Sequence, residues 1–98
     1  MSVKVHWTRQ AREDLRQIRA FIARDTPLTA AAFVRRLRAS VDRIRSFPEF
    51  GQVVPELGHH DIREILHGSY RIIYRSRTEG VDILTAYHSS RLLDDTQF

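Results

Sequence analysis

The sequence lacks cysteine altogether and contains no long hydrophobic run. Without cysteine, the chain can form neither a disulfide scaffold nor a thiolate zinc site, and it has no cysteine nucleophile. The longest uninterrupted apolar stretch, residues 30–34, is far shorter than the roughly 20 residues that a membrane-spanning helix needs. The first residues also contain no hydrophobic segment of signal-peptide length. We therefore expect a cytoplasmic protein with no membrane partner.

Glycine is scarce, and histidine does not occur at a familiar ligand spacing. The four glycines are scattered, so they form neither a phosphate-binding loop nor a dinucleotide-binding fingerprint. Among the five histidines, His59 and His60 are adjacent and would point in opposite directions on a strand. No serine lies in the glycine-flanked elbow of a serine hydrolase. The sequence therefore predicts no metal site and no cofactor.

Lysine is nearly absent, although the chain as a whole is basic. Of the 16 basic side chains, only Lys4 is not arginine. The length of 98 residues predicts a single domain. Residues 1–50 carry eleven basic and five acidic side chains, and residues 51–98 carry five and seven. Because guanidinium groups bind carboxylates and phosphates through paired hydrogen bonds, an acidic protein or a nucleic acid would suit such a chain. Helix faces that are merely solvated would carry the same arginines.

Hydrophobic periodicity predicts a strand followed by two helices. Residues 3–7 alternate between apolar and polar side chains, as a half-buried strand does. Apolar residues at helical spacing then predict one helix after Thr8 and a second that runs from Pro27 to Phe47. Thr8 and Thr26 are the predicted N-caps. The very short turn between the helices requires them to pack antiparallel.

The second half of the chain predicts a loop and three strands. Residues 47–60 contain two prolines and two glycines, which is typical of a loop. Residues 62–67 and 70–76 are β-rich runs joined by Gly68 and Ser69, a strong hairpin signal, and residues 81–87 form the last strand. The predicted fold class is α+β, with an N-terminal strand, an antiparallel helical hairpin and a three-stranded antiparallel meander. Together the strands form one mostly antiparallel sheet covered on one face by the helices.

Strand alternation also predicts a cationic surface on the face that the helices leave open. Regular alternation in the last strand would place Val81, Ile83, Thr85 and Tyr87 opposite Asp82, Leu84, Ala86 and His88. We expect Arg63, Arg71, Arg75 and His88 to gather on or around the open face, where they would suit a phosphate or a carboxylate. The alternative is a solvated face with exposed ion pairs, such as Arg63 or Arg75 with Glu64 or Asp82.

Three motifs together resemble the ParE/RelE superfamily of bacterial toxins. Residues 63–75 read REILHGSYRIIYR, residues 83–93 read ILTAYHSSRLL, and residues 47–51 read FPEFG. The order of predicted elements is also that of the superfamily. The resemblance implies the toxin of a type II toxin–antitoxin pair, of the kind often encoded on plasmids or in chromosomal stress modules. It also implies an antitoxin whose C-terminal segment wraps around the toxin.

The superfamily has two branches with different targets. The ParE branch poisons DNA gyrase and blocks replication, whereas the RelE branch cuts messenger RNA on the ribosome. Nucleases of the RelE branch place lysines where this chain has Ile62 and Glu64, and a carboxylate would repel the scissile phosphate. Arg71 and His88 do match an arginine and a histidine of nuclease members. Our hypothesis is a ParE-like gyrase inhibitor without catalytic residues, and the alternative is an mRNA endoribonuclease acting through Arg71 and His88.

The resemblance and the charge distribution together suggest two contact surfaces. The expected target-binding residues are Arg63, Arg71, Arg75, His88 and Arg91. A ParD-like antitoxin, acidic and partly disordered alone, would bind the helical hairpin. The residues expected to contact it are Arg9, Arg12, Arg16, Arg19 and Leu37. A third possibility is a degenerate member that is only sequestered by its antitoxin.

Overall fold

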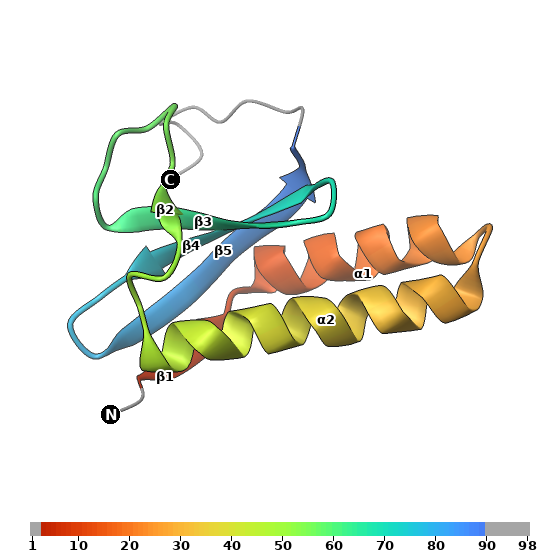
Figure 1. The fold of residues 1–98 in the computed structure, drawn as a ribbon, viewed down its shortest axis with the longest axis horizontal. Helices are drawn as coiled ribbons and strands as arrows, with labels where there is room; N and C mark the ends of the chain where they lie inside the picture. Colours follow the sequence, from red (N-terminus) through yellow and green to blue (C-terminus); the bar gives the residue numbers. More distant parts are fainter. Residues whose placement is uncertain (1–2, 90–98) are drawn as a thin grey trace.

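A computed structural model of the chain describes residues 3–89. Its elements are β1 (Lys4–Trp7), α1 (Arg9–Ala23), α2 (Pro27–Ser46), β2 (Gln52–Val53), β3 (Ile62–His67), β4 (Tyr70–Ser76) and β5 (Gly80–His88). The strands of residues 3–89 form one sheet in the order β1-β5-β4-β3-β2, in which β1 and β5 pair parallel and the other neighbours pair antiparallel. The two helices lie side by side across one face of this sheet (Figure 1). The α+β prediction is confirmed, and β2 adds a two-residue strand within the segment predicted as a loop.

Local signals explain where the helices begin. Thr8 has an extended backbone, and its hydroxyl accepts a hydrogen bond from the Ala11 amide at 3.1 Å. The same hydroxyl donates to the Ile83 carbonyl at 2.7 Å, which attaches the start of α1 to β5. Thr26 is also in the N-cap position, but it makes no capping bond because its hydroxyl is directed to the Ile22 carbonyl at 3.4 Å. Within residues 3–89, neither helix combines the length and apolarity needed to cross a membrane.

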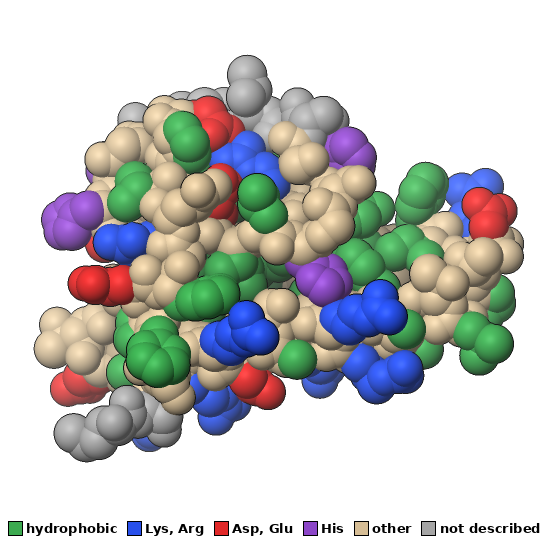
Figure 2. Space-filling view, in the orientation of Figure 1, with side chains coloured by type: hydrophobic (Ala, Val, Ile, Leu, Met, Phe, Trp, Pro, Cys, Tyr) green, Lys and Arg blue, Asp and Glu red, His purple; other side chains and the backbone are tan. Residues whose placement is uncertain are grey.

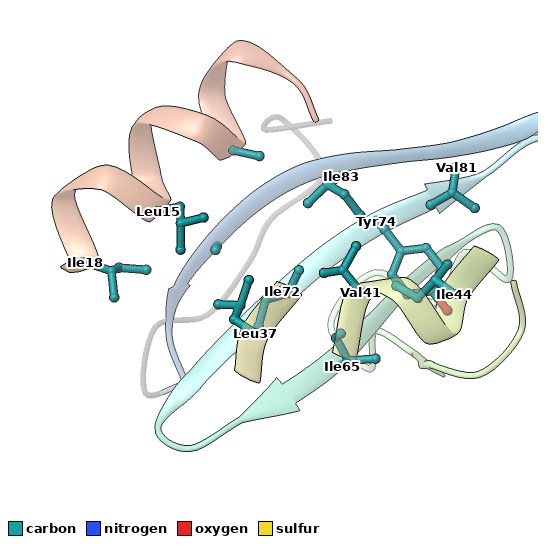
Figure 3. Packing of buried hydrophobic residues seen from close by; sticks show 12 residues of the cluster. Leu15, Ile18, Leu37, Val41, Ile44, Ile65, Ile72, Tyr74, Val81 and Ile83 are labelled. Atoms are coloured by element: carbon teal, nitrogen blue, oxygen red, sulfur yellow. The ribbon is translucent and has the colours of Figure 1, made fainter. Parts of the chain in front are cut away.

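The main hydrophobic core lies between the helices and the sheet (Figure 3). Its buried members are Ala11, Leu15, Ile18, Leu37, Val41, Ile44, Ile65, Ile72, Tyr74, Val81, Ile83 and Ala86. Burying one such leucine or isoleucine contributes roughly 1.5–3 kcal/mol, so this layer is the principal source of stability. It also explains why the apolar stripes of both helices follow the period of 3.6 residues.

A bulge in β5 changes which face its last residues occupy. Ile73 pairs with Thr85 whereas Tyr74 pairs with Ile83, so Leu84 has no partner in the β4–β5 register. Ala86 therefore joins the helix-side core, while Leu84 and Tyr87 pack on the opposite face. The prediction of strict alternation from Val81 to His88 is wrong beyond the bulge, and His88 lies on the helix side.

Asp14 of α1 stabilises the bulged part of β5. Its Oδ2 accepts a hydrogen bond from the Ala86 amide at 3.2 Å and another from the Thr85 hydroxyl. A carboxylate from the covering helix thus satisfies polar groups of the irregular strand, as a buried backbone requires.

The face opposite the helices is partly covered by the loop that precedes β3. Val54, Ile62 and Ile73 form a second small core, to which Leu57, Leu84 and Tyr87 contribute. The sheet is therefore packed on both faces in this part of the molecule.

Candidate functional site

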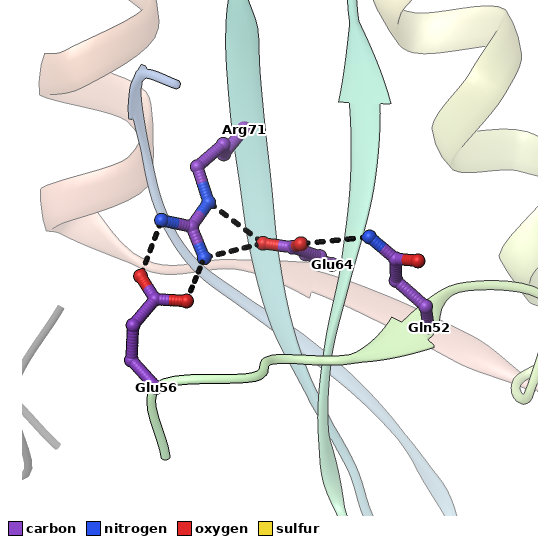
Figure 4. A network of polar contacts seen from close by, with 4 residues as sticks. All are labelled: Gln52, Glu56, Glu64 and Arg71. Atoms are coloured by element: carbon purple, nitrogen blue, oxygen red, sulfur yellow. Dashed lines mark hydrogen bonds and ion pairs between the residues drawn. The ribbon is translucent and has the colours of Figure 1, made fainter. Parts of the chain in front are cut away.

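The central β-hairpin carries a buried network of ion pairs around Arg71. The Arg71 side chain, from β4, is only 6% exposed, and its Nε donates to Glu64 Oε2 at 2.7 Å (Figure 4). Its Nη1 and Nη2 donate to the two carboxylate oxygens of Glu56 at 2.5 and 2.9 Å. Gln52 Nε2 completes the network by donating to Glu64 Oε1 at 2.9 Å. The network therefore joins β4, β3, β2 and the following loop.

The charges of this network are balanced within the chain. The hydrogen bonds that Arg71 donates to Glu56 and then to Glu64 raise its pKa well above the ordinary value, although burial acts in the opposite direction. The guanidinium is therefore always charged, and two carboxylates of the same chain neutralise it. The prediction that Arg71 is available to an external anion is wrong, because Glu56 and Glu64 occupy its donors.

The predicted cationic surface does not assemble on one face. Arg63 pairs across the strands with Tyr74 of the main core, and its Nη1 donates to the Gly51 carbonyl at 2.9 Å. His88 lies on the helix side, where its ring is 5.7 Å from that of Tyr70. Arg71 and His88 consequently lie on opposite faces of the sheet.

Ion pairs occupy the other predicted positions on the open face. Arg75 is 35% exposed, and its Nε lies 3.7 Å from Asp61. Arg77 pairs with Asp82 at 2.9 Å. The alternative of an ion-paired face was therefore closer to the structure, although its partners differ from those predicted. Arg91 lies outside the described residues.

A groove between the two helices carries a second concentration of arginine. This cavity has a volume of about 390 Å³. Its apolar lining comes from Trp7, Leu15 and Val34, and its cationic lining from Arg12, Arg16, Arg19 and Arg38. Arg16 pairs with Glu13, whereas the other three arginines have no carboxylate partner within residues 3–89. Basic side chains also follow the exposed side of α2 (Figure 2). An acidic segment with an apolar stripe would match this groove in shape and charge.

The groove contains three of the five residues predicted to contact an antitoxin. Arg9 is exposed at the start of α1 but does not line this groove. Leu37 is completely buried because it faces the sheet beside Val41, so the prediction that it contacts a partner is wrong. Sequence reasoning missed Arg38, whose signal was its position one helical turn after Val34.

An aromatic cluster lies where α2 covers the end of the β-hairpin. The ring of Phe33 is 4.9 Å from that of His67 and 5.4 Å from that of Tyr70. Burial, and secondarily the charge of Arg36, lowers the pKa of His67.

Within the described part of the chain, no three histidine or carboxylate side chains are placed to hold a metal ion.

Comparison with known proteins agrees with this architecture. Residues 5–93 match a family described as the ParE toxin of the type II toxin–antitoxin system parDE. A solved structure titled "Chromosomal ParDE TA system from P. aeruginosa" contains a similar chain, with a TM-score of 0.75 and 19% sequence identity. The similarity covers 89% of this chain and 96% of that one, and at this identity it concerns the fold. No curated protein matches the sequence. The family match extends over nearly the whole chain, and the chain therefore belongs to the ParE family of type II toxins.

Proposed function

We propose that this ParE-family toxin arrests growth by binding DNA gyrase and that a ParD-like antitoxin neutralises it. The observation that carries the proposal is the state of Arg71. A RelE-like nuclease would need this guanidinium beside the scissile phosphate, but here Glu56 and Glu64 bind it. The buried Glu64 carboxylate would repel a phosphate at the same position.

The separation of Arg71 from His88 supports the same proposal. A nuclease that used both residues would need them on one side of the sheet, within reach of one phosphodiester. The bulge in β5 instead places His88 beside Tyr70 on the helix side. The chain is better suited to binding than to cutting RNA, and gyrase as the target implies that the toxin acts in the cytoplasm.

The groove between the helices is the proposed antitoxin site. Trp7, Leu15 and Val34 would receive an apolar stripe, while Arg12, Arg19 and Arg38 would pair with carboxylates. A segment that folds on binding has an ordering cost, so an unbound antitoxin stays open to proteolysis. Arg75, His88 and Arg91 remain proposed target contacts.

The target is tested by inducing the toxin in growing cells and following DNA and protein synthesis by precursor incorporation. We expect DNA synthesis to stop first and antitoxin co-expression to prevent the arrest. Early loss of translation, with cut transcripts on ribosomes, would favour the nuclease alternative. Arg71→Ala does not distinguish the gyrase proposal from the nuclease alternative, because this substitution also disturbs the fold. His88→Ala is therefore the better variant. His88→Ala should leave toxicity within about twofold of wild type if the toxin acts by binding, because a single contact at the rim of a protein interface contributes little to affinity.

The antitoxin site is tested by charge reversal in the groove. Arg12→Glu/Arg19→Glu should weaken antitoxin binding at least about tenfold, because like charges would face the acidic segment. Arg35→Glu is the matched control, since Arg35 is exposed on α2 but does not line the groove. Equal losses for the groove variant and the control would show a general effect of charge and contradict the proposed site.

A further inference from the structure

The loop after α2 exposes two phenylalanines at the end of the molecule opposite the turn between the helices. Phe47 is 66% exposed and Phe50 is 48% exposed. The Phe50 amide donates to the Phe47 carbonyl at 2.8 Å, so the two residues are the ends of one tight turn. Hydrophobic and basic side chains lie next to each other over the C-terminal end of α2 (Figure 2). We call Phe47, Phe50 and Arg43 the aromatic patch.

Hydrogen bonds from side chains of the sheet fix the backbone of this turn. The Tyr74 hydroxyl, buried under the loop, accepts a hydrogen bond from the Gly51 amide at 2.8 Å and donates to the Pro48 carbonyl at 2.8 Å. Arg63 Nη1 adds a bond to the Gly51 carbonyl. A Cβ at position 51 would lie 2.6 Å from the Glu64 carbonyl oxygen and 2.7 Å from the Tyr74 hydroxyl, so only glycine fits.

Rigidity and exposure together indicate a binding role. Two large aromatic side chains held in water by a fixed turn forgo the stabilisation that burial would give each of them. Because the turn is already ordered, a partner that covers it would lose little conformational entropy on binding. No fold requirement explains the exposure of both rings, whereas a partner surface would.

The charged residues around the patch indicate which chemical groups a partner would need. The Arg43 guanidinium lies 5.7 Å from the centroid of the Phe50 ring and has no carboxylate partner within residues 3–89. Arg45, by contrast, already lies 3.5 Å from Asp42. Asp42 and Glu49 make the surroundings mixed in charge, so recognition would depend on one carboxylate aimed at Arg43 and not on bulk charge. An apolar pocket with a carboxylate on its rim fits these features.

The size of the patch argues against a second copy of this chain as the occupant. Aromatic side chains present about 150–250 Å² each, so the exposed parts of the two rings amount to roughly 200 Å². A standard interface needs about 800 Å² from each partner. The patch therefore suits an anchor within a larger contact, in the manner of a hot spot.

We propose that the aromatic patch anchors the toxin to its cellular target protein, by inserting Phe47 and Phe50 into an apolar pocket with a carboxylate at its rim. This inference rests on the proposed function in that the chain acts by binding a protein. The patch shares no residue with the groove assigned to the antitoxin, so one surface can be changed without the other.

The test compares Phe47→Ala/Phe50→Ala with a matched control, Phe21→Ala/Leu28→Ala. The control removes two apolar side chains that are 63% and 88% exposed at the opposite end of the helical hairpin. Each variant is assayed for inhibition of gyrase supercoiling, for growth arrest on induction, for antitoxin affinity and for oligomeric state in solution. We expect the patch variant to need on the order of thirtyfold more toxin for inhibition and to lose growth arrest. Its antitoxin affinity should stay within about twofold of wild type, and the control should behave as wild type.

Substitutions of Arg43 alone provide an independent test of the proposed carboxylate on the partner. Arg43→Glu should impair growth arrest more than Arg43→Gln, because a new carboxylate would face the one on the partner. Equal effects of the two substitutions would contradict the predicted rim carboxylate.

The outcomes separate this inference from the proposed function. If the wild-type toxin arrests growth but does not inhibit gyrase, gyrase is the wrong target, and the growth-arrest comparison still tests the patch. Full growth arrest by the patch variant would overturn the inference. An equal loss of antitoxin binding would assign the patch to the antitoxin, and conversion of a wild-type dimer to a monomer would assign it to a second copy. Either result also overturns the inference.

Discussion

Replacing Arg71 by alanine should destabilise the fold severely, because it would leave two carboxylates without their cation. The side chains of Arg71 and Glu64 are 6% and 4% exposed, and that of Glu56 is 19% exposed. Breaking a buried ion pair by removing one partner costs about 3–5 kcal/mol. In the variant, Gln52 would still donate to Glu64, but a neutral amide cannot replace a guanidinium.

The expected loss is large compared with the total stability of a small domain. Since domains of this kind unfold with about 5–15 kcal/mol, a loss of about 3–5 kcal/mol would remove at least about a fifth of that stability. At about 4–8 °C per kcal/mol for a domain of up to 100 residues, the melting temperature should fall by more than about 12 °C. Arg75→Ala is the control on the same strand, because its pair with Asp61 is longer and more exposed and should contribute less than about 1 kcal/mol.

The assay is urea unfolding followed by circular dichroism, at low and at high salt. Buried pairs are little screened, so the loss for Arg71→Ala should be nearly the same at both salt concentrations. Adding Glu56→Gln and Glu64→Gln to Arg71→Met should recover much of the stability, because no buried charge would remain. A loss for Arg71→Ala as small as that for Arg75→Ala would refute the conclusion that the network is buried and internally neutralised.

Three other substitutions test separate parts of the structure. Tyr74→Phe should cost about 1–3 kcal/mol of unfolding free energy, since the hydroxyl serves two backbone groups of the aromatic-patch loop, whereas Tyr70→Phe should cost much less. Thr8→Ala should cost about 1 kcal/mol and Thr26→Ala only a few tenths, because only Thr8 makes a capping bond; thermal melts of both variants provide the comparison. Because burial lowers the pKa of His67 in the folded chain, the unfolded chain binds more protons as the pH is lowered through about 6.5. The free energy of unfolding therefore decreases as the pH is lowered in this range. The urea midpoint should therefore drop less between pH 7.5 and 5.5 in His67→Gln than in wild type, and equal drops would contradict the assigned shift.

Most of the fold could be predicted because its signals are local. Pro27 at the start of α2 and Pro48 after its end mark that helix correctly. Gly68 has a φ of 58°, which a glycine adopts at no steric cost, and it begins the turn between β3 and β4 as predicted. The apolar stripes identified the buried sides of both helices, including Leu37, whose assignment to a partner contradicted its own position in that stripe.

The predicted site failed where non-local contacts decide the result. Glu56 reaches Arg71 from a loop fifteen residues earlier, and no periodicity in the sequence indicates that contact. The bulge at Leu84 depends on pairing between β4 and β5 and on Asp14 of α1, so counting along β5 alone placed His88 on the wrong face. Sequence patterns report which residues share an element, whereas the charge balance of a site depends on which elements meet.

Purified toxin assayed side by side on gyrase and on ribosome-bound mRNA distinguishes a toxin that binds gyrase from one that cuts RNA. We expect the toxin to inhibit supercoiling, the cognate antitoxin to reverse this inhibition, and transcripts on ribosomes to stay intact at the same concentration. Cleaved transcripts together with unimpaired supercoiling would contradict the proposed function, because the guanidinium of Arg71 would then have to reach a phosphate while two carboxylates of the same chain bind it.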